Sequence, residues 1–382
     1  MAEALVNPKL LVWARVRALL DTDAMAAALK VPVARIASWE EGAARPSFTQ
    51  AERWAHVTHV PFGMLYAPQP PEEVPLPPDF RTIAGKAHRP SPAFRDLYDD
   101  VLFKHAWYRS YRREEGFPPV GFVNSLSAHV APATLSRAMR TEISAPRSGA
   151  SSGEDYYRAL IAAAEQAGVW VMRSGTVAGN TSRAVKPDEF RGFAIADRDA
   201  PLVFINASDA ISAQIFTLVH ELAHLWLGKT GVSDPFVASS DSSERLCNAA
   251  AAEFLVPGDM LAGLWRKDEP AEAQFVSLAR EFKVSAAVVA IRAREQRLVS
   301  RNIVDGFIEK QRSAWKQAGR KKKKKSGGDF YRTLVTRNGR PFTRAVLSSA
   351  LSQELFIRDA GQLLNVNPAR VMEAARREGL TT

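Results

Sequence analysis

The spacing of apolar residues in the first 66 positions predicts a bundle of short helices. Apolar side chains recur every three or four residues, which is the period of one helix face. We expect helices at residues 10–20, 23–30, 33–40 and 49–58, with a final turn near Met64. Asp21 and Asp23 are candidate caps of the second helix, because an aspartate before a helix accepts hydrogen bonds from its free N–H groups.

The middle of the chain mixes helical and strand patterns. Helices are predicted at residues 91–115 and 155–167, and the apolar runs 169–172, 191–196 and 202–206 are typical of strands. Two further apolar segments read as helices and stop at Gly228 and Pro257. The helix at 91–115 carries an aromatic stripe, which favours packing between helices over base stacking. Its members are Phe94, Tyr98, Phe103, Trp107, Tyr108 and Tyr111.

The last third is predicted to be helical, apart from one linker. Helices are expected at residues 274–283 and 285–294, and another ends near Gly319. A helix-turn-helix-like pattern follows at residues 357–371, where Pro368 stands at a helix start.

Two stretches that cannot form a packed core divide the chain. Residues 67–81 contain six prolines and should be extended, and residues 311–328 contain five consecutive lysines before a Ser-Gly-Gly sequence. We therefore expect an N-terminal module at 1–66, a linker at 67–81, a central domain at 82–310, a second linker at 311–328 and a C-terminal module at 329–382. The fold class is α+β and mostly helical, with a small sheet packed on the apolar helix that ends at Gly228 and helix-turn-helix-like modules on both sides.

The positive charge is concentrated at the C-terminal end. The chain of 382 residues has a net charge of +10. Residues 301–382 hold 18 Lys/Arg and seven Asp/Glu, whereas residues 1–66 hold seven and six. Attraction to nucleic acid is therefore expected from the C-terminal part.

The single cysteine excludes an intramolecular disulfide framework and fits a reducing compartment. No segment has the pattern of a signal peptide or the length of a membrane span. We therefore expect a cytoplasmic protein with no membrane partner.

Two histidines lie one helical turn apart in the apolar helix before Gly228. His220 and His224 form an H-E-x-x-H pattern with Glu221, and residues four apart share one face of a helix. Two imidazoles on one face suit a Zn²⁺ ion, with Glu221 as general base toward water. The alternative is a buried helix whose histidines bond to backbone carbonyls. We favour zinc, because a carboxylate follows on the next helix.

Two carboxylates on that next helix are candidates for the third ligand. Glu244 and Glu253 are nine residues apart, which is two and a half helical turns, so they point to different sides. Cys247 lies near the same face as Glu244. It is either a small packing residue or a thiolate that occupies the open metal position and leaves on oxidation.

The segments HELAHLWLG at 220–228 and ERLCNAAAAEFLVP at 244–257 resemble the ImmA/IrrE family of metallopeptidases. The tetrapeptide at residues 79–82 also matches that family. The resemblance implies Glu244 as the third ligand, with Asn248 beside a ligand histidine. Glu253 would then be a solvated or helix-pairing carboxylate. The resemblance also implies that the strand at 202–206, or its neighbour, lines a cleft and holds the substrate by strand addition.

A peptidase also needs a donor that stabilises the oxyanion of the reaction. The residues do not identify this donor. We consider Arg191 and Asn206, which belong to the predicted strands, as candidates for the oxyanion or the substrate.

Residues 26–42 resemble the helix-turn-helix of phage-repressor, or XRE-type, domains. Arg35 is the one residue at the start of its second helix that offers a bidentate contact to guanine. A fold retained for dimerisation or partner docking is the alternative, because residues 1–66 are nearly neutral. The better nucleic-acid candidates are C-terminal, and they comprise Lys321, Lys322, Lys323, Lys324, Lys325 and Arg370.

The resemblance implies a regulatory zinc peptidase that cleaves a protein partner, either a transcriptional repressor or a toxin–antitoxin component, in a stress or phage response. A homodimer and contacts to DNA are further expectations. The alternative function is a non-proteolytic regulator or antitoxin that uses the peptidase fold for binding. A zinc hydrolase with another substrate is less favoured, because the cleft is expected beside an exposed strand.

Overall fold

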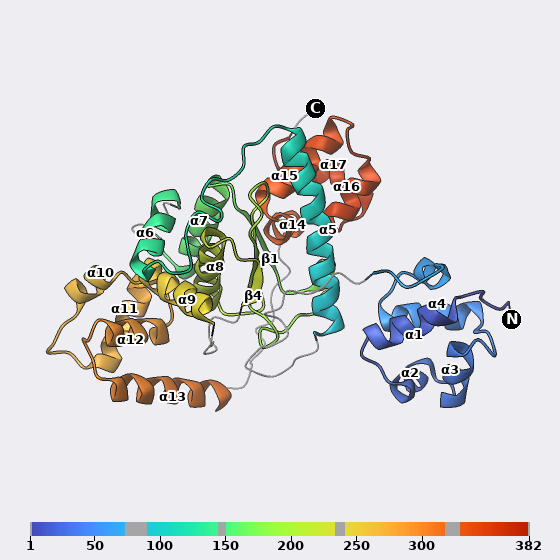
Figure 1. Ribbon diagram of the computed structural model, residues 1–382, viewed down its shortest axis with the longest axis horizontal. Helices are drawn as coiled ribbons and strands as arrows, with labels where there is room; N and C mark the ends of the chain where they lie inside the picture. The colour runs from blue at the N-terminus through green and yellow to red at the C-terminus, as the bar shows by residue number, and fades with distance from the viewer. Residues whose placement is uncertain (1, 73–89, 144–149, 234–240, 318–328, 381–382) are drawn as a thin grey trace. The chain divides into compact units, whose positions relative to one another are not determined.

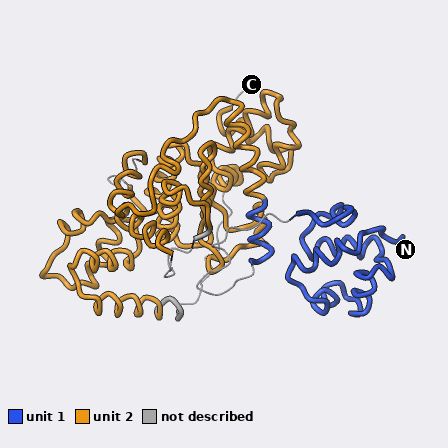
Figure 2. The backbone as a smooth tube through the Cα atoms, in the orientation of Figure 1, with its two compact units in different colours: residues 1–76, 89–99 blue, residues 77–88, 100–382 orange. Residues whose placement is uncertain are grey.

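The computed structural model describes residues 2–72, 90–143, 150–233, 241–317 and 329–380 (Figure 1). The chain divides into two compact units (Figure 2). The first comprises residues 1–76 and 89–99, and the second comprises residues 77–88 and 100–382. The architecture is α+β and mostly helical, as predicted.

The first unit is a bundle of short helices. Its elements are α1 (Pro8–Arg17), α2 (Thr22–Leu29), α3 (Val33–Glu40), α4 (Phe48–Thr58) and the 3₁₀ helix η1 (Phe62–Tyr66). The side chain of Asp21 caps α2, and Ser47 forms a capping box with Gln50 at the start of α4. Trp39 and Trp54 meet edge to face in the core. Each helix lies within three residues of its predicted position.

The second unit is built on a four-stranded sheet in the order β1-β3-β2-β4. The strands are β1 (Trp170–Ser174), β2 (Gly192–Ile195), β3 (Leu202–Asn206) and β4 (Gly231–Ser233). β3 pairs with β1 in parallel and with β2 antiparallel, and β4 pairs antiparallel with the other side of β2.

The expectation that residues 202–206 hold a substrate by strand addition is wrong for β3. Both of its edges are hydrogen-bonded to neighbouring strands, so it has no free backbone groups for another chain. Strand order depends on pairing between distant segments, which the apolar pattern of one strand does not reveal. The outer strands of the described sheet are β1 and β4.

Helix α8 (Ile211–Trp226) lies beside the sheet (Figure 1). It packs against β2 and β3. It is apolar around nearly its whole circumference, and every residue from Gln214 to Trp226 is buried. Helices α6 (Pro132–Glu142), α7 (Gly153–Gln166) and α9 (Ser242–Leu255) surround it. α6 and β4 have no counterpart among the predicted elements.

Four helices extend this core beyond α9. They are α10 (Gly258–Leu264), α11 (Ala271–Phe282), α12 (Ala286–Glu295) and α13 (Arg301–Gln317). α11 and α12 fall within three residues of their predicted positions. The guanidinium of Arg292 on α12 is buried, and its Nε donates to the carbonyl oxygen of Val256 at 3.1 Å.

Two of the C-terminal helices, α14 (Phe330–Asn338) and α15 (Arg340–Leu351), pack against β1. The others, α16 (Ile357–Leu364), the 3₁₀ helix η4 (Pro368–Arg370) and α17 (Val371–Arg377), pack on these two and on one another. The ring of Phe342 stacks on Trp170 at 4.6 Å between centroids, and Trp170 Nε1 donates to the carbonyl oxygen of Asn338 at 2.6 Å. A side chain at Gly339 would collide with the Trp170 ring.

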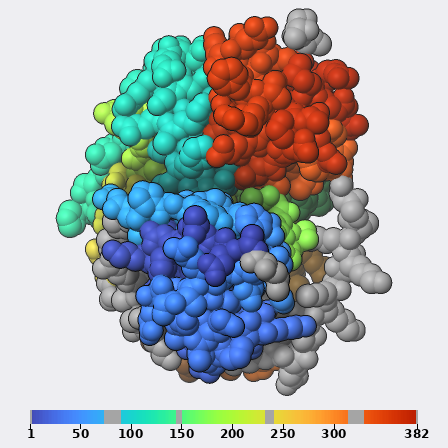
Figure 3. All heavy atoms as spheres, turned by 90° about the vertical axis from the view of Figure 1, so that its right-hand side faces the viewer, coloured from blue at the N-terminus to red at the C-terminus, as the bar shows by residue number. Residues whose placement is uncertain are grey.

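Helix α5 (Pro92–Glu114) contributes its residues from Asp100 onward to the same packing. Tyr108 lies edge to face on Trp170 and Phe342, so this part of the aromatic stripe packs between elements, as predicted. In the space-filling view, the red surface of the C-terminal helices adjoins the teal surface of the segment after Asp100 (Figure 3).

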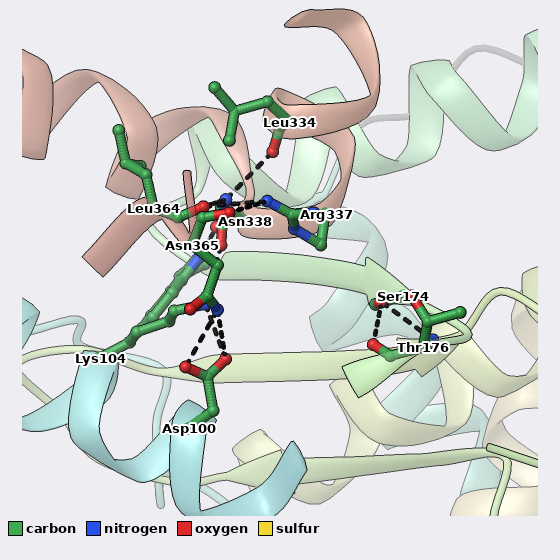
Figure 4. Close-up of polar contacts among 10 residues, drawn as sticks. Asp100, Lys104, Ser174, Thr176, Leu334, Arg337, Asn338, Leu364 and Asn365 are labelled. Carbon is green, nitrogen blue, oxygen red and sulfur yellow. Dashed lines mark hydrogen bonds and ion pairs between the residues drawn. The ribbon is translucent and has the colours of Figure 1, made fainter. Parts of the chain in front are cut away.

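A buried lysine fixes this contact (Figure 4). Lys104 Nζ donates to Asp100 Oδ2 at 2.7 Å and to Asn338 Oδ1 at 3.0 Å. Asn365 Nδ2 donates to both oxygens of Asp100. Burial lowers the pKa of Lys104, and its interactions with Asp100 oppose that effect. The C-terminal helices are therefore joined to α5 by a polar network as well as by aromatic packing.

Within the described residues, no helix is both long enough and apolar enough to cross a membrane.

Candidate metal centre

Helices α8 and α9 bring two imidazoles and one carboxylate to one point. His220 Nε2 and His224 Nε2 are 3.0 Å apart. Glu244 in the first turn of α9 places Oε2 at 3.2 Å from His220 Nε2 and Oε1 at 3.0 Å from His224 Nε2. Both histidines are buried, and the Glu244 side chain is 15% exposed.

The three donor groups fit a zinc ion. Two imidazole nitrogens and a carboxylate oxygen are the ligand set of several catalytic zinc sites. Neighbouring ligand atoms of a tetrahedral ion lie about 3.3 Å apart when the metal–ligand bonds are about 2.0–2.1 Å. The separations of 3.0–3.2 Å in this cluster are close to that value.

Local sequence explains why the two helices carry these groups to the same place. One helical turn separates His220 from His224, so both face α9. The side chain of Asp241 caps α9 by accepting from the backbone N–H of Ser243, which fixes the start of the helix next to Glu244.

Glu221 is fully buried on α8. It directly follows His220 in the sequence and lies three residues before His224. Strand β2 passes close over it at Gly192. A Cβ atom added at Gly192 would lie 2.7 Å from Thr217 Cγ2, 2.9 Å from the carbonyl oxygen of Phe204 and 3.1 Å from Glu221 Cγ. The missing side chain at Gly192 therefore lets the sheet approach the helix at the level of Glu221.

Burial and mutual interactions shift the pKa values of the three clustered side chains. Burial lowers the pKa of His220, although hydrogen bonding to Glu244 and Asn248 opposes this. Burial also lowers the pKa of His224, but interactions with Cys247, Glu244 and Glu221 outweigh it, and the net shift is well upward. Burial raises the pKa of Glu244, yet hydrogen bonds from both histidines bring it far below the ordinary range. A negative carboxylate thus faces the imidazoles.

Asn248 and Cys247 of α9 each interact with one of the two histidines. The side chain of Asn248 interacts with His220, one turn after Glu244 on α9. Cys247 is fully buried and contacts His224, but its sulfur is outside the cluster of candidate ligand atoms. The proposed switching role of Cys247 stays a prediction.

Glu253 lies elsewhere in the structure. Its carboxylate forms an ion pair with Arg292 of α12, and Oε1 accepts from the backbone N–H of Gly258 at 3.4 Å. The helix-pairing alternative for Glu253 therefore describes its position, whereas Glu244 is the carboxylate that lies beside the two histidines.

Arg191 and Asn206 make contacts that hold the sheet and its loops. The guanidinium of Arg191 is paired with Asp209 in the loop before α8. Asn206 is fully buried, and its Nδ2 donates to the carbonyl oxygens of Val185 and Phe190. Its Oδ1 accepts from the backbone N–H of Ser208. The Asn206 side chain therefore holds the loop before β2 and the loop after β3 by hydrogen bonds to their backbone.

The candidate nucleic-acid-binding residues lie in separate parts of the chain. Arg35 is exposed on α3 of the first unit. Arg370 is exposed on η4, and its guanidinium lies 4.4 Å from the centroid of the Phe330 ring. Lys321, Lys322, Lys323, Lys324 and Lys325 lie outside the described residues.

Gly192 is the site residue that the sequence analysis did not single out. A glycine inside a strand pattern signals either a bulge or a close approach of another backbone. The sequence alone does not show which element lies over that strand, so Glu221 could not be identified as its neighbour.

Two segments of the chain match known protein families. Residues 164–294, which include both α8 and α9, match the IrrE N-terminal-like domain, peptidase family M78. Residues 338–377 match a domain of unknown function, DUF8813. Comparison with curated proteins gives no match. The first match supports a place in the ImmA/IrrE family for the part of the chain that carries the candidate metal centre, and it points to a metallopeptidase.

Proposed function

We propose that this protein is a zinc-dependent regulatory peptidase that cleaves a protein partner. The observation that carries the proposal is the convergence of His220, His224 and Glu244 within 3.2 Å of one another. The family match over residues 164–294 supports the same reaction class. A transcriptional repressor or a toxin–antitoxin component is the proposed partner, in keeping with the resemblance to ImmA/IrrE proteins.

His220, His224 and Glu244 would hold the ion, and Asn248 would orient the His220 ring. When bound, Zn²⁺ acts as a Lewis acid toward the scissile carbonyl and lowers the pKa of water toward neutrality. Glu221 then accepts a proton from the attacking water and delivers it to the leaving amine nitrogen. Burial of Glu221 next to the cluster keeps this proton transfer away from bulk solvent.

The substrate strand must be held elsewhere than at β3. Strand β4 is an outer strand of the described sheet and pairs with β2, which carries Gly192 over Glu221. We propose that an extended substrate segment pairs with this side of the sheet. Contacts to DNA, through Arg35 or the basic C-terminal part, and a homodimer stay predictions.

The test compares cells that carry the wild-type protein with cells that carry Glu221→Gln. This substitution keeps the size of the side chain and removes the general base. Labelling of protein N-termini followed by mass spectrometry should reveal at least one new terminus that depends on Glu221, in a repressor or toxin–antitoxin protein. If the Glu221→Gln cells show the same termini and the same biological response, the non-proteolytic regulator is the correct function.

A further inference from the structure

The second unit contains a cavity of about 1060 Å³ away from the residues of the metal centre. Its wall is formed by the end of α5, residues 117–125, the C-terminal ends of α6, α7 and α8, and one face of α15. Sites for small molecules commonly enclose about 300–1,000 Å³. This cavity is therefore large enough for a metabolite-sized ligand.

The cavity wall offers aromatic rings and positive charge. Tyr111 and Phe117 line it, and the guanidinium of Arg112 lies 5.1 Å from the centroid of the Phe117 ring. Arg112 Nε is buried and has no hydrogen-bond partner within the described residues. Arg344 of α15 lines the same cavity and is exposed. These groups suit a planar ring that carries an anionic substituent.

The cavity wall also offers a hydrogen-bond acceptor. Glu165 near the end of α7 lines the cavity, and its Oε1 accepts from the backbone N–H of Arg340 at 3.1 Å. Within the part of the chain that the structure describes, Oε2 has no protein donor. A ligand with N–H groups on its ring would complete the hydrogen bonding of this carboxylate.

We propose that this cavity binds a nucleotide, that is, a planar heterocycle with N–H donors and a phosphate group. The heterocycle would lie on Tyr111 and Phe117 and donate to Glu165. The phosphate would accept from Arg112 and Arg344. The binding does not depend on the peptidase function proposed above.

The cavity is joined to the helix that carries the metal-binding histidines. Trp226, the last residue of α8, lines the cavity and stacks on Phe122 at 4.1 Å between ring centroids. The backbone N–H groups of Asn124 and Leu126 donate to the carbonyl oxygens of Leu225 and Trp226 at 2.9 and 3.0 Å. A nucleotide in the cavity would therefore stabilise the end of α8, two residues after His224.

The test is calorimetric titration of the full-length protein with GMP, AMP and their nucleosides, guanosine and adenosine. At least one of the two nucleotides should bind saturably below about 1 mM. Arg344→Ala should weaken binding of that nucleotide at least about tenfold and leave binding of its nucleoside unaffected, because it removes a charged hydrogen bond to phosphate. Glu165→Gln should weaken binding of that nucleotide and its nucleoside alike. Arg358→Ala is the matched control, because its side chain is 85% exposed and does not line the cavity.

Amide hydrogen exchange shows where the nucleotide binds. Binding should slow exchange at Asn124 and Leu126. Absence of saturable binding overturns the proposal. So does equal weakening by Arg344→Ala and Arg358→Ala, which would indicate non-specific attraction, or binding without protection of residues 117–126, which would place the nucleotide elsewhere.

Discussion

A methyl group at Gly192 would lie 3.1 Å from Cγ of Glu221, closer than real side-chain contacts normally allow. The same atom would lie 2.9 Å from the backbone oxygen of Phe204, which cannot move without disturbing the sheet. The packing of β2 on α8 therefore depends on the absence of a side chain at this position.

We predict that Gly192→Ala lowers both stability and peptidase activity. Overpacking of a tight contact typically costs about 1–3 kcal/mol, and here it would displace Glu221 from its position. Urea unfolding and the cleavage assay measure the two effects. Gly263→Ala on α10 is the control, since an added Cβ there meets no atom within 4 Å. Equal behaviour of the two variants would contradict the packing argument.

Glu253 and Arg292 give a prediction about structure rather than catalysis. Arg292→Met should lower the free energy of unfolding by about 1–3 kcal/mol, because it removes the ion pair with Glu253 and leaves the carbonyl oxygen of Val256 without its buried donor. Zinc content per folded chain should not change. Arg294→Met on the same helix should alter stability by no more than about 0.5 kcal/mol. Loss of zinc in Arg292→Met would instead connect Glu253 to the metal.

We predict that the C-terminal helices unfold together with the four-stranded sheet. Phe342→Ala removes a fully buried ring that stacks on Trp170 and should cost about 3–5 kcal/mol. Phe356→Ala, in which the lost ring is 78% exposed, should have little effect. Thermal unfolding can be followed by tryptophan fluorescence, to which Trp170 contributes, and by circular dichroism of the whole chain. Both signals should show one shared transition. A separate early transition in Phe342→Ala would indicate an independent C-terminal domain.

Glu165 gives the clearest pH dependence. Burial raises the pKa of Glu165 to about 7, opposed by the hydrogen bond from the backbone of Arg340. The folded state then binds a proton more tightly than the unfolded state. Its contribution to stability is fully present below pH 4.5 and is lost as the pH rises through about 7.

The size of this effect is on the order of 1–3 kcal/mol. Denaturant unfolding of the wild type and of Glu165→Gln between pH 4 and pH 8 measures it, since the variant lacks the titrating group. The exposed Glu354→Gln should keep the wild-type slope. The idea fails if Glu165→Gln and the wild type lose stability in parallel over this range.

Local patterns predicted the elements that carry the candidate centre. The spacing of His220 and His224 needs only one helix, and the apolar run around them specifies that helix. The strand at 202–206 was also predicted with its observed bounds, because its apolar residues lie between turn residues. Choosing Glu244 over Glu253 required the resemblance to ImmA/IrrE proteins, since helix geometry alone left both open.

Contacts between segments that are far apart in the chain could not be predicted from the sequence. β3 has the pattern of any buried strand, and its interior place in the sheet follows only from pairing with β1 and β2. The docking of Phe342 on Trp170 joins residues 172 positions apart across a predicted linker. The contact between Gly192 and Glu221 likewise depends on which helix covers the strand.

Metal analysis of the purified full-length protein tests the central claim most directly. Mass spectrometry of the wild type, purified without chelators, should find about one zinc ion per chain, and Glu244→Gln should lose most of it. Glu253→Gln, a matched change on the same helix, should keep it. A wild-type protein without zinc, or a Glu244→Gln protein with undiminished zinc, would contradict the account.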